Sequence, residues 1–205
     1  MPKRKNSSKT CSSVKRKKEN FLAGNYKKCF SFMEEIKWYF VFSVGLFSLF
    51  FLIGFIFPIF FREQIISIIA DLSTMLDGKS VIGTIIFIFL NNVQSGFISF
   101  VLGIGLAVFP LMTLIFNGYL LGFVGREVAA REGILVLWRI LPHGIFELPA
   151  IFLSTSIGIK IGVDFFLNKK SLKYNYREGL RFFVFVVVPL LIIAAAIEGL
   201  LISLL

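Results

Sequence analysis

An uncharged run of 46 residues, from Ser80 to Gly125, limits the possible folds of this chain more than any other segment. A helix rises about 1.5 Å per residue and the hydrocarbon core of a bilayer is about 30 Å thick, so one crossing takes about 20 residues. The run is too long for one crossing and must fold back on itself. The stretch from Gly103 to Pro110 holds two glycines that loosen a helix and a proline suited to starting the next one. We expect a tight hairpin of two spans, 81–104 and 109–125.

The composition places the chain in a membrane. Hydrophobic residues make up 57% of it and charged residues 17%, with 26 phenylalanines and a mean hydropathy of +0.84. A water-soluble domain of 205 residues cannot bury so much apolar surface. We therefore expect an all-α polytopic membrane bundle of about five transmembrane helices. The other three spans are predicted at 38–61, 143–163 and 182–205.

Shorter segments of mixed character lie between the spans. Arg62 to Lys79 alternates polar and apolar residues, which predicts a loop with a short surface helix. Ile134 to Leu141 includes Trp138 and Arg139 in an apolar setting, which indicates a short interfacial or re-entrant helix. In the last span, Pro189 predicts a kink.

Basic residues are concentrated at the start of the chain. Of the net charge of +10, a balance of +8 lies between Met1 and Lys37, which hold 11 Lys and Arg against three Glu. We expect residues 1–37 to form a disordered cytoplasmic arm that is attracted to anionic lipid headgroups. Nucleic acid is not an expected partner, because no base-reading fold accompanies the charge.

The distribution of Lys and Arg among the loops predicts the orientation of the chain. The segment 160–181 holds six basic residues, whereas 62–80 and 125–133 hold two each. Loops rich in Lys and Arg stay on the cytoplasmic side of a membrane. We therefore expect a multi-pass protein of the cell membrane with a cytoplasmic N-terminus and an external C-terminus.

The residues that usually hold metals or cofactors are scarce. Cys11 and Cys29 are the only cysteines, with neither CxxC spacing nor a histidine nearby in sequence, which argues against a disulfide or a metal centre. His143 is the only histidine, whereas a hydrolytic zinc site typically uses more than one imidazole. No serine or cysteine stands beside a base in sequence, and no glycine-rich phosphate loop carries a lysine. We expect no catalytic residue, no metal and no cofactor.

The motif L-P-H-G-I-F-E-L-P at 141–149 places two ionisable side chains, four residues apart, on one helix face at the start of a span. Such groups are costly in lipid, so they mark a site that faces protein. The helical rise places further polar residues in the same outer half of the bilayer. The predicted intramembrane polar site comprises Asn91, Asn92, Asn117, His143, Glu147 and Glu198, with Arg126 and Arg139 as possible charge partners.

Each of these residues also has a structural explanation. The three asparagines can bond across helices, at about 0.6 to 2 kcal/mol each. His143 can donate to Glu147 or to a carbonyl near Pro142. The glutamates are harder to explain in this way, because an intramembrane carboxyl must be protonated, paired or hydrated.

Small residues recur every fourth position on three of the expected spans. This spacing lets membrane helices approach closely, so we interpret these residues as packing surfaces and not as ligand loops. The residues expected to serve helix packing are Ser95, Ser99, Gly103, Gly118, Gly122, Gly158 and Gly162, together with Ser154.

Four motifs in this order resemble the stage II sporulation protein M family of multi-pass membrane proteins. They are L-N-N-V in the second span, N-G-Y-L-L-G at 117–122, L-P-H-G-I-F-E-L-P-A at 141–150 and A-A-I-E at 195–198. The resemblance covers about residues 38–205 and leaves out the basic arm. It implies a small all-helical membrane protein whose namesake in spore-forming bacteria is a scaffold for a peptidoglycan-degrading complex.

Three functions are compatible with these observations. The first is a non-enzymatic scaffold or regulator of a membrane or envelope-remodelling complex, which implies membrane or envelope proteins as partners. The second is a transporter or exporter component that uses the His/Glu/Asn site, with Glu147 cycling its proton. The third is an intramembrane enzyme with a metal at His143 and Glu147.

Overall fold

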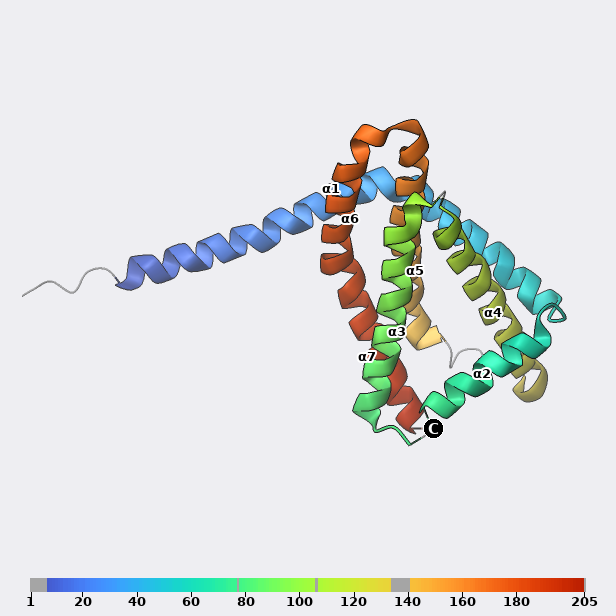
Figure 1. The fold of residues 1–205 in the computed structure, drawn as a ribbon. Helices are drawn as coiled ribbons and strands as arrows, with labels where there is room; N and C mark the ends of the chain where they lie inside the picture. The colour runs from blue at the N-terminus through green and yellow to red at the C-terminus, as the bar shows by residue number, and fades with distance from the viewer. Residues whose placement is uncertain (1–6, 77, 106, 134–140, 205) are drawn as a thin grey trace, which may run out of the picture.

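The structure is a computed structural model that describes the backbone of residues 7–76, 78–105, 107–133 and 141–204. Within these ranges, side chains are described except at 7–20, 72–73, 76, 141–143 and 203–204. Every regular element in the described ranges is a helix (Figure 1). In chain order they are α1 (Ser7–Ile56), α2 (Arg62–Leu76), α3 (Val81–Val101), η1 (Leu102–Ile104), α4 (Val108–Glu132), α5 (Leu141–Leu167), η3 (Lys169–Ser171), α6 (Leu172–Phe182), η4 (Phe183–Val187) and α7 (Val188–Leu204).

Five helical segments are long and apolar enough to cross a membrane, which confirms the predicted all-α fold with about five spans. The segments are Phe21–Ile56, Val81–Ile104, Val108–Glu132, Gly144–Leu167 and Lys169–Ile202. The short surface helix expected after Arg62 is present as α2. The interfacial or re-entrant helix expected at Ile134 to Leu141 falls, apart from Leu141, outside the described residues.

The first helix is longer than the sequence analysis predicts. Residues 1–37 are expected to be disordered, but α1 already begins at Ser7. We call residues 21–37 the arm. Within it, Cys29, Phe32 and Ile36 are buried at one helical spacing and belong to the main hydrophobic core. Lysine and arginine are good helix formers, and their charges obscure this apolar stripe in the composition.

The helices form two lobes that meet at one end of the molecule. In the first lobe, α1 and α4 pack so closely that a Cβ at Gly122 would clash with the Phe51 carbonyl and a Cβ at Gly54 with the Tyr119 carbonyl. In the second lobe, α7 packs against α3 and α5, and Gly199 lies directly against Ile85. Figure 1 shows the lobes diverging away from the end where the arm lies.

The expected tight hairpin of spans two and three is only partly present. The turn itself is tight, with η1 followed by Ala107 in a left-handed conformation (φ 57°) just before α4 begins. The two helices then separate, because α5 lies in the angle between them. Gly158 of α5 is so close to both that a Cβ there would meet the Ser99 carbonyl and the Pro110 ring. The small residues therefore bring in a third helix at the turn.

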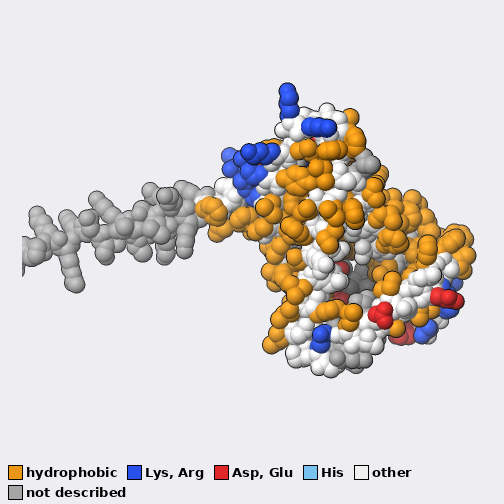
Figure 2. All heavy atoms as spheres, in the orientation of Figure 1, with side chains coloured by type: hydrophobic (Ala, Val, Ile, Leu, Met, Phe, Trp, Pro, Cys, Tyr) orange, Lys and Arg blue, Asp and Glu red, His pale blue; other side chains and the backbone are white. Residues whose placement is uncertain are grey.

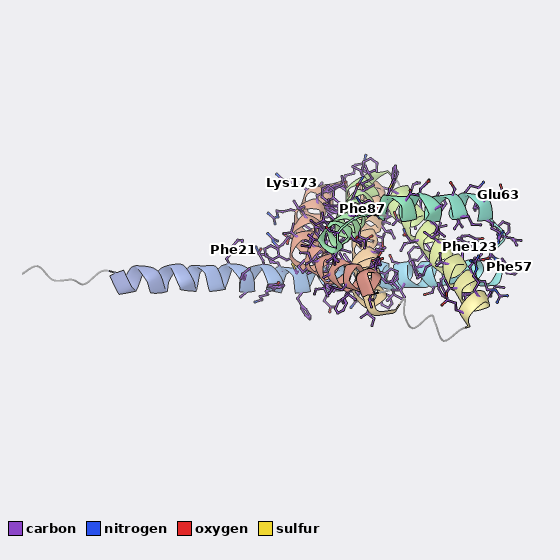
Figure 3. The ribbon with its side chains drawn as sticks, turned by 90° about the horizontal axis from the view of Figure 1, so that it is seen from below. Phe21, Phe57, Glu63, Phe87, Phe123 and Lys173 are labelled. Atoms are coloured by element: carbon purple, nitrogen blue, oxygen red, sulfur yellow. The ribbon has the colours of Figure 1, made fainter. Side chains whose placement is uncertain are left out.

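The two ends of the bundle differ in how they are closed. We call the end formed by the arm, η1 and residues 160–181 the arm end, and the opposite end the α2 end. At the α2 end, Ile65 is the buried contact of α2 and packs with Tyr119 and Phe123. The Tyr119 hydroxyl donates to the carbonyls of Phe57 and Phe60, which fixes the turn before α2. Viewed from this end, α1 crosses the whole molecule, from Phe21 on one side to Phe57 on the other (Figure 3).

The last crossing contains a local distortion. Between α6 and α7, the segment η4 is a five-residue π-helix. Pro189 follows in the first turn of α7, where it cannot donate a backbone hydrogen bond. The irregularity expected at Pro189 thus lies one turn earlier, as a π-bulge. The bulge accommodates the backbone hydrogen bond that Pro189 cannot donate.

Candidate functional site

Glu147 and Glu198 come together from different parts of the chain. Glu147 lies on α5 and Glu198 on α7, and both side chains are half-buried. They are close enough for their charges to repel one another. Glu147 is next to Leu148, which packs on the core cluster that joins α1 to α5, so the pair lies where the lobes begin to separate. The structure therefore brings together two of the residues predicted for the intramembrane site.

The surface of the molecule is hollowed between the two lobes (Figure 2). Figure 2 shows the surface hollowed between the two lobes, above α2, with acidic side chains visible on its walls. Helix α2 crosses the mouth of the hollow and is held by Ile65 and by Arg62, whose guanidinium lies 3.9 Å from Glu127 of α4. The exposed apolar residues of α2 are Ile66, Ile68, Ile69 and Met75. Of the side chains described on α2, only Ile65 is buried.

Three other residues predicted for the site differ in their exposure or lie outside the described side chains. Asn91 is exposed and Asn92 half-buried on α3. The side chain of His143 and the whole of Arg139 lie outside the described residues. Among the described residues, no three His, Cys, Asp or Glu side chains form a cluster able to hold a metal.

Asn117 and Arg126, both on α4, have partners other than the acidic pair. The Asn117 amide donates to the Thr113 carbonyl of its own helix, at 2.7 Å. The Arg126 guanidinium lies over the ring of Phe55, 5.9 Å from its centroid. These two residues therefore support the α1/α4 lobe.

The small residues lie at helix contacts. Cβ atoms at Gly103, Gly118 and Gly162 would each come within contact distance of a backbone atom of a neighbouring helix. Ser99 is fully buried, and its hydroxyl bonds that of Thr113 at 2.7 Å, which joins α3 to α4. Ser95 is half-buried on the same face of α3.

A second polar cluster, at the arm end, was not predicted from the sequence. Its centre is Asn175, which is fully buried and donates to Asp164 at 2.5 Å. Asp164 also accepts hydrogen bonds from Lys160 at 3.3 Å and Ser171 at 3.0 Å. The Oδ1 atom of Asn175 is buried without a partner among the described residues. The cluster ties α5 to α6 across their connection.

This cluster extends to the arm. The ammonium of Lys160 lies 3.8 Å from Glu35, and the Tyr174 hydroxyl donates to Glu35 at 2.7 Å. Both bonds join α1 to residues more than a hundred positions later in the chain. A polar connection therefore accompanies the buried contacts of Cys29, Phe32 and Ile36.

The third part of the cluster is an ion pair on α6. Glu178 is 5% exposed and pairs with Arg181 and, at 3.1 Å, with Arg177. A carboxylate at this depth is costly unless it is paired. A sequence signal was present: Asn175, Glu178 and Phe182 recur at i, i+3 and i+7, which is the spacing of a buried face. It was obscured because two of the three residues are polar.

Comparison with known proteins identifies the family of this chain. The family described as stage II sporulation protein M matches residues 43–201. An uncharacterized protein of Methanocaldococcus jannaschii is 31% identical over 123 residues, which is 56% of this chain and 54% of that protein. A second uncharacterized protein of the same organism is 33% identical over 118 residues, covering 54% of this chain and 66% of that protein. The chain thus spans between about half and two thirds of the length of these relatives. No solved structure matches it.

Proposed function

Because this chain belongs to the stage II sporulation protein M family, we propose that it is a non-enzymatic membrane scaffold or regulator of an envelope-remodelling complex. The observation that carries the proposal is the attachment of the arm. Buried contacts at Phe32 and Ile36 and the bonds from Glu35 to Lys160 and Tyr174 fix the arm to the bundle. A partner bound along the arm would therefore be held at a defined place relative to the membrane.

The arm also lies outside the region shared with the family, since the match begins at residue 43. A partner of the arm would then be particular to this protein, whereas the helical bundle that holds the arm is shared with the family.

We further propose that the arm end is cytoplasmic and the C-terminus external in the cell membrane. This orientation is supported by the concentration of basic side chains at the arm end in Figure 2.

In-cell photocrosslinking tests the scaffold role. A photoreactive residue at Ser31, which is exposed on the arm, should form discrete adducts with one or a few membrane or envelope proteins. The matched control is Phe116, which is 56% exposed on α4 and lies outside the arm. Equal adduct patterns from the two positions, or none from Ser31, would argue against a partner at the arm.

A second candidate function is transport, because two acidic residues of membrane-spanning helices, Glu147 and Glu198, come together. Ionisable side chains within membrane spans are typical of ion or proton pathways. Reconstituted vesicles distinguish the two functions through Glu147→Gln. A scaffold loses stability or assembly and shows no flux, whereas a transporter shows proton-coupled solute uptake that the substitution abolishes.

A further inference from the structure

A groove of about 340 Å³ opens where the arm meets α5 and η4. From α1 it is lined by Tyr26, Cys29, Phe30, Met33 and Phe40, from α5 by Pro149 and Leu153, and from the last crossing by Phe182 and Val186. Its walls are almost wholly apolar. From Tyr26 to Phe40 it follows α1 for about 21 Å, given a rise of about 1.5 Å per residue.

The arm has the pattern of a helix that lies at a membrane surface. Cys29 and Phe32 face the bundle, while Tyr26 and Phe30 are 53% and 73% exposed on the adjoining side, toward the groove. Charged and small polar residues occupy the opposite side. Such a helix lies in the headgroup region with its apolar side toward the acyl chains. The groove thus extends from headgroup level toward the middle of the bilayer.

The charge beside the groove is positive. Lys27 and Lys28 are exposed on the polar side of the arm, and Lys27 precedes the groove residue Phe30 by three positions, so the two are neighbours on the helix surface. Neither lysine has an acidic partner within ion-pair distance among the described side chains. The acids of the arm are engaged elsewhere, Glu34 with Lys37 at 3.1 Å and Glu35 with Lys160 and Tyr174. Two ammonium groups without an acidic partner among the described side chains therefore lie on the polar side of the arm, next to the side that lines the groove.

We propose that this groove binds one acyl chain of an anionic phospholipid, whose headgroup contacts Lys27 and Lys28. The chemistry of the groove selects the occupant. Its almost wholly apolar walls suit a hydrocarbon chain, and the lysines of the arm suit an anionic headgroup. A single extended hydrocarbon chain has the right shape and chemistry. This site is independent of the scaffold role and stands or falls separately from it.

Native mass spectrometry of the full chain tests the site. The protein is extracted in detergent and mixed with equal amounts of phosphatidylglycerol and phosphatidylcholine. We expect one phosphatidylglycerol to remain bound per chain, with little phosphatidylcholine. In the Lys27→Glu, Lys28→Glu double variant, retention of phosphatidylglycerol should fall about fivefold per lysine changed. The control reverses another adjacent and exposed pair at the arm end, Lys169 and Lys170, and should keep the lipid.

A second pair of variants tests the groove itself. Val186→Phe places a ring in the groove and should abolish retention of the lipid, while Val184→Phe should not. Val184 is on the same π-helix but 51% exposed and away from the groove. If Val186→Phe does not fold, the lysine pair decides the proposal alone. Equal retention of both lipids, unchanged retention in the lysine variant, or a dimer in place of a lipid adduct would overturn it.

Discussion

The arm end and the α2 end of this bundle use polar residues in opposite ways. At the arm end, Asp164, Asn175 and Glu178 are bonded to one another's helices or to arginines and lysines. Lys160 of the same cluster also pairs with Glu35 of α1, far away in sequence. At the α2 end, two half-buried acidic residues, Glu147 and Glu198, come together from α5 and α7. Polar side chains at the first end thus join helices through hydrogen bonds and opposite charges, whereas at the second end two acidic side chains approach each other.

The contrast between the two ends indicates where the free energy of folding is concentrated. Buried polar groups contribute to a unique structure only when they are paired, and otherwise they cost stability. The arm end combines paired charges with the largest hydrophobic core, whereas Ile65 is the one buried residue among the described side chains of α2. We expect the arm end to be the last part to unfold, and α2 to be the element that moves most easily.

The largest expected effect is the loss of a buried ion pair at the arm end. Glu178→Ala leaves Arg181, which is 18% exposed, without its partner, and should lower the free energy of unfolding by roughly 3–5 kcal/mol. Thermal or denaturant unfolding in detergent measures this loss.

The matched change at the α2 end is Glu127→Ala, whose carboxylate is 30% exposed and pairs with Arg62 and Arg131. It should cost at most about 1 kcal/mol, as expected for a more exposed pair. Similar losses at the two ends would remove the contrast between them.

A smaller effect is expected from adding one methyl group at each end. Gly103→Ala forces a Cβ into the backbone of Gly158 and should destabilise the protein by about 1–3 kcal/mol. Gly144→Ala, at the start of α5, meets only a side-chain atom of Leu148 at 3.9 Å and should stabilise the helix by up to about 1 kcal/mol. Melting temperatures of the two variants should therefore move in opposite directions, and a shift in the same direction would contradict the packing described for the arm end.

The smallest predicted effect concerns the point where the lobes are still joined. The hydroxyls of Ser43 and Ser156 bond at 3.2 Å across α1 and α5, and both residues are fully buried. Ser156→Ala should cost only about 0.6 kcal/mol, the average for a hydrogen bond between membrane helices. A double-mutant cycle with Ser43→Ala isolates this bond. A coupling energy above about 2 kcal/mol would mean that this contact, and not the arm end, holds the lobes together.

Much of the architecture could be predicted from the sequence because apolar length decides it. The uncharged run after Ser80 had to contain a turn, and the turn lies at η1 and Ala107 where glycines and Pro110 placed it. Which helices pack against each span could not be predicted, since apolar residues cover most of the surface of every span. That α5 would lie between α3 and α4 follows from Gly158 and its backbone contacts, which only the folded structure reveals.

The candidate site was predictable only where a polar residue interrupts an apolar span. Glu147 and Glu198 stood out for this reason and do come together. Asn117 stood out equally, but its amide bonds its own helix. Spacing along the sequence indicates how deep a residue lies in the membrane but not which way its side chain points. The cluster around Asn175 was missed because its residues occur in a charged stretch, where burial has no compositional signal.

Hydrogen exchange of the full chain in lipid nanodiscs tests the contrast between the two ends most directly. If the arm is folded onto the bundle, backbone amides of residues 25–36 should be protected as strongly as those in the middle of α5, while those of residues 66–76 in α2 exchange much faster. Arm amides that exchange as fast as those of α2 would contradict the account, because the arm would then be the unattached segment that its composition suggests.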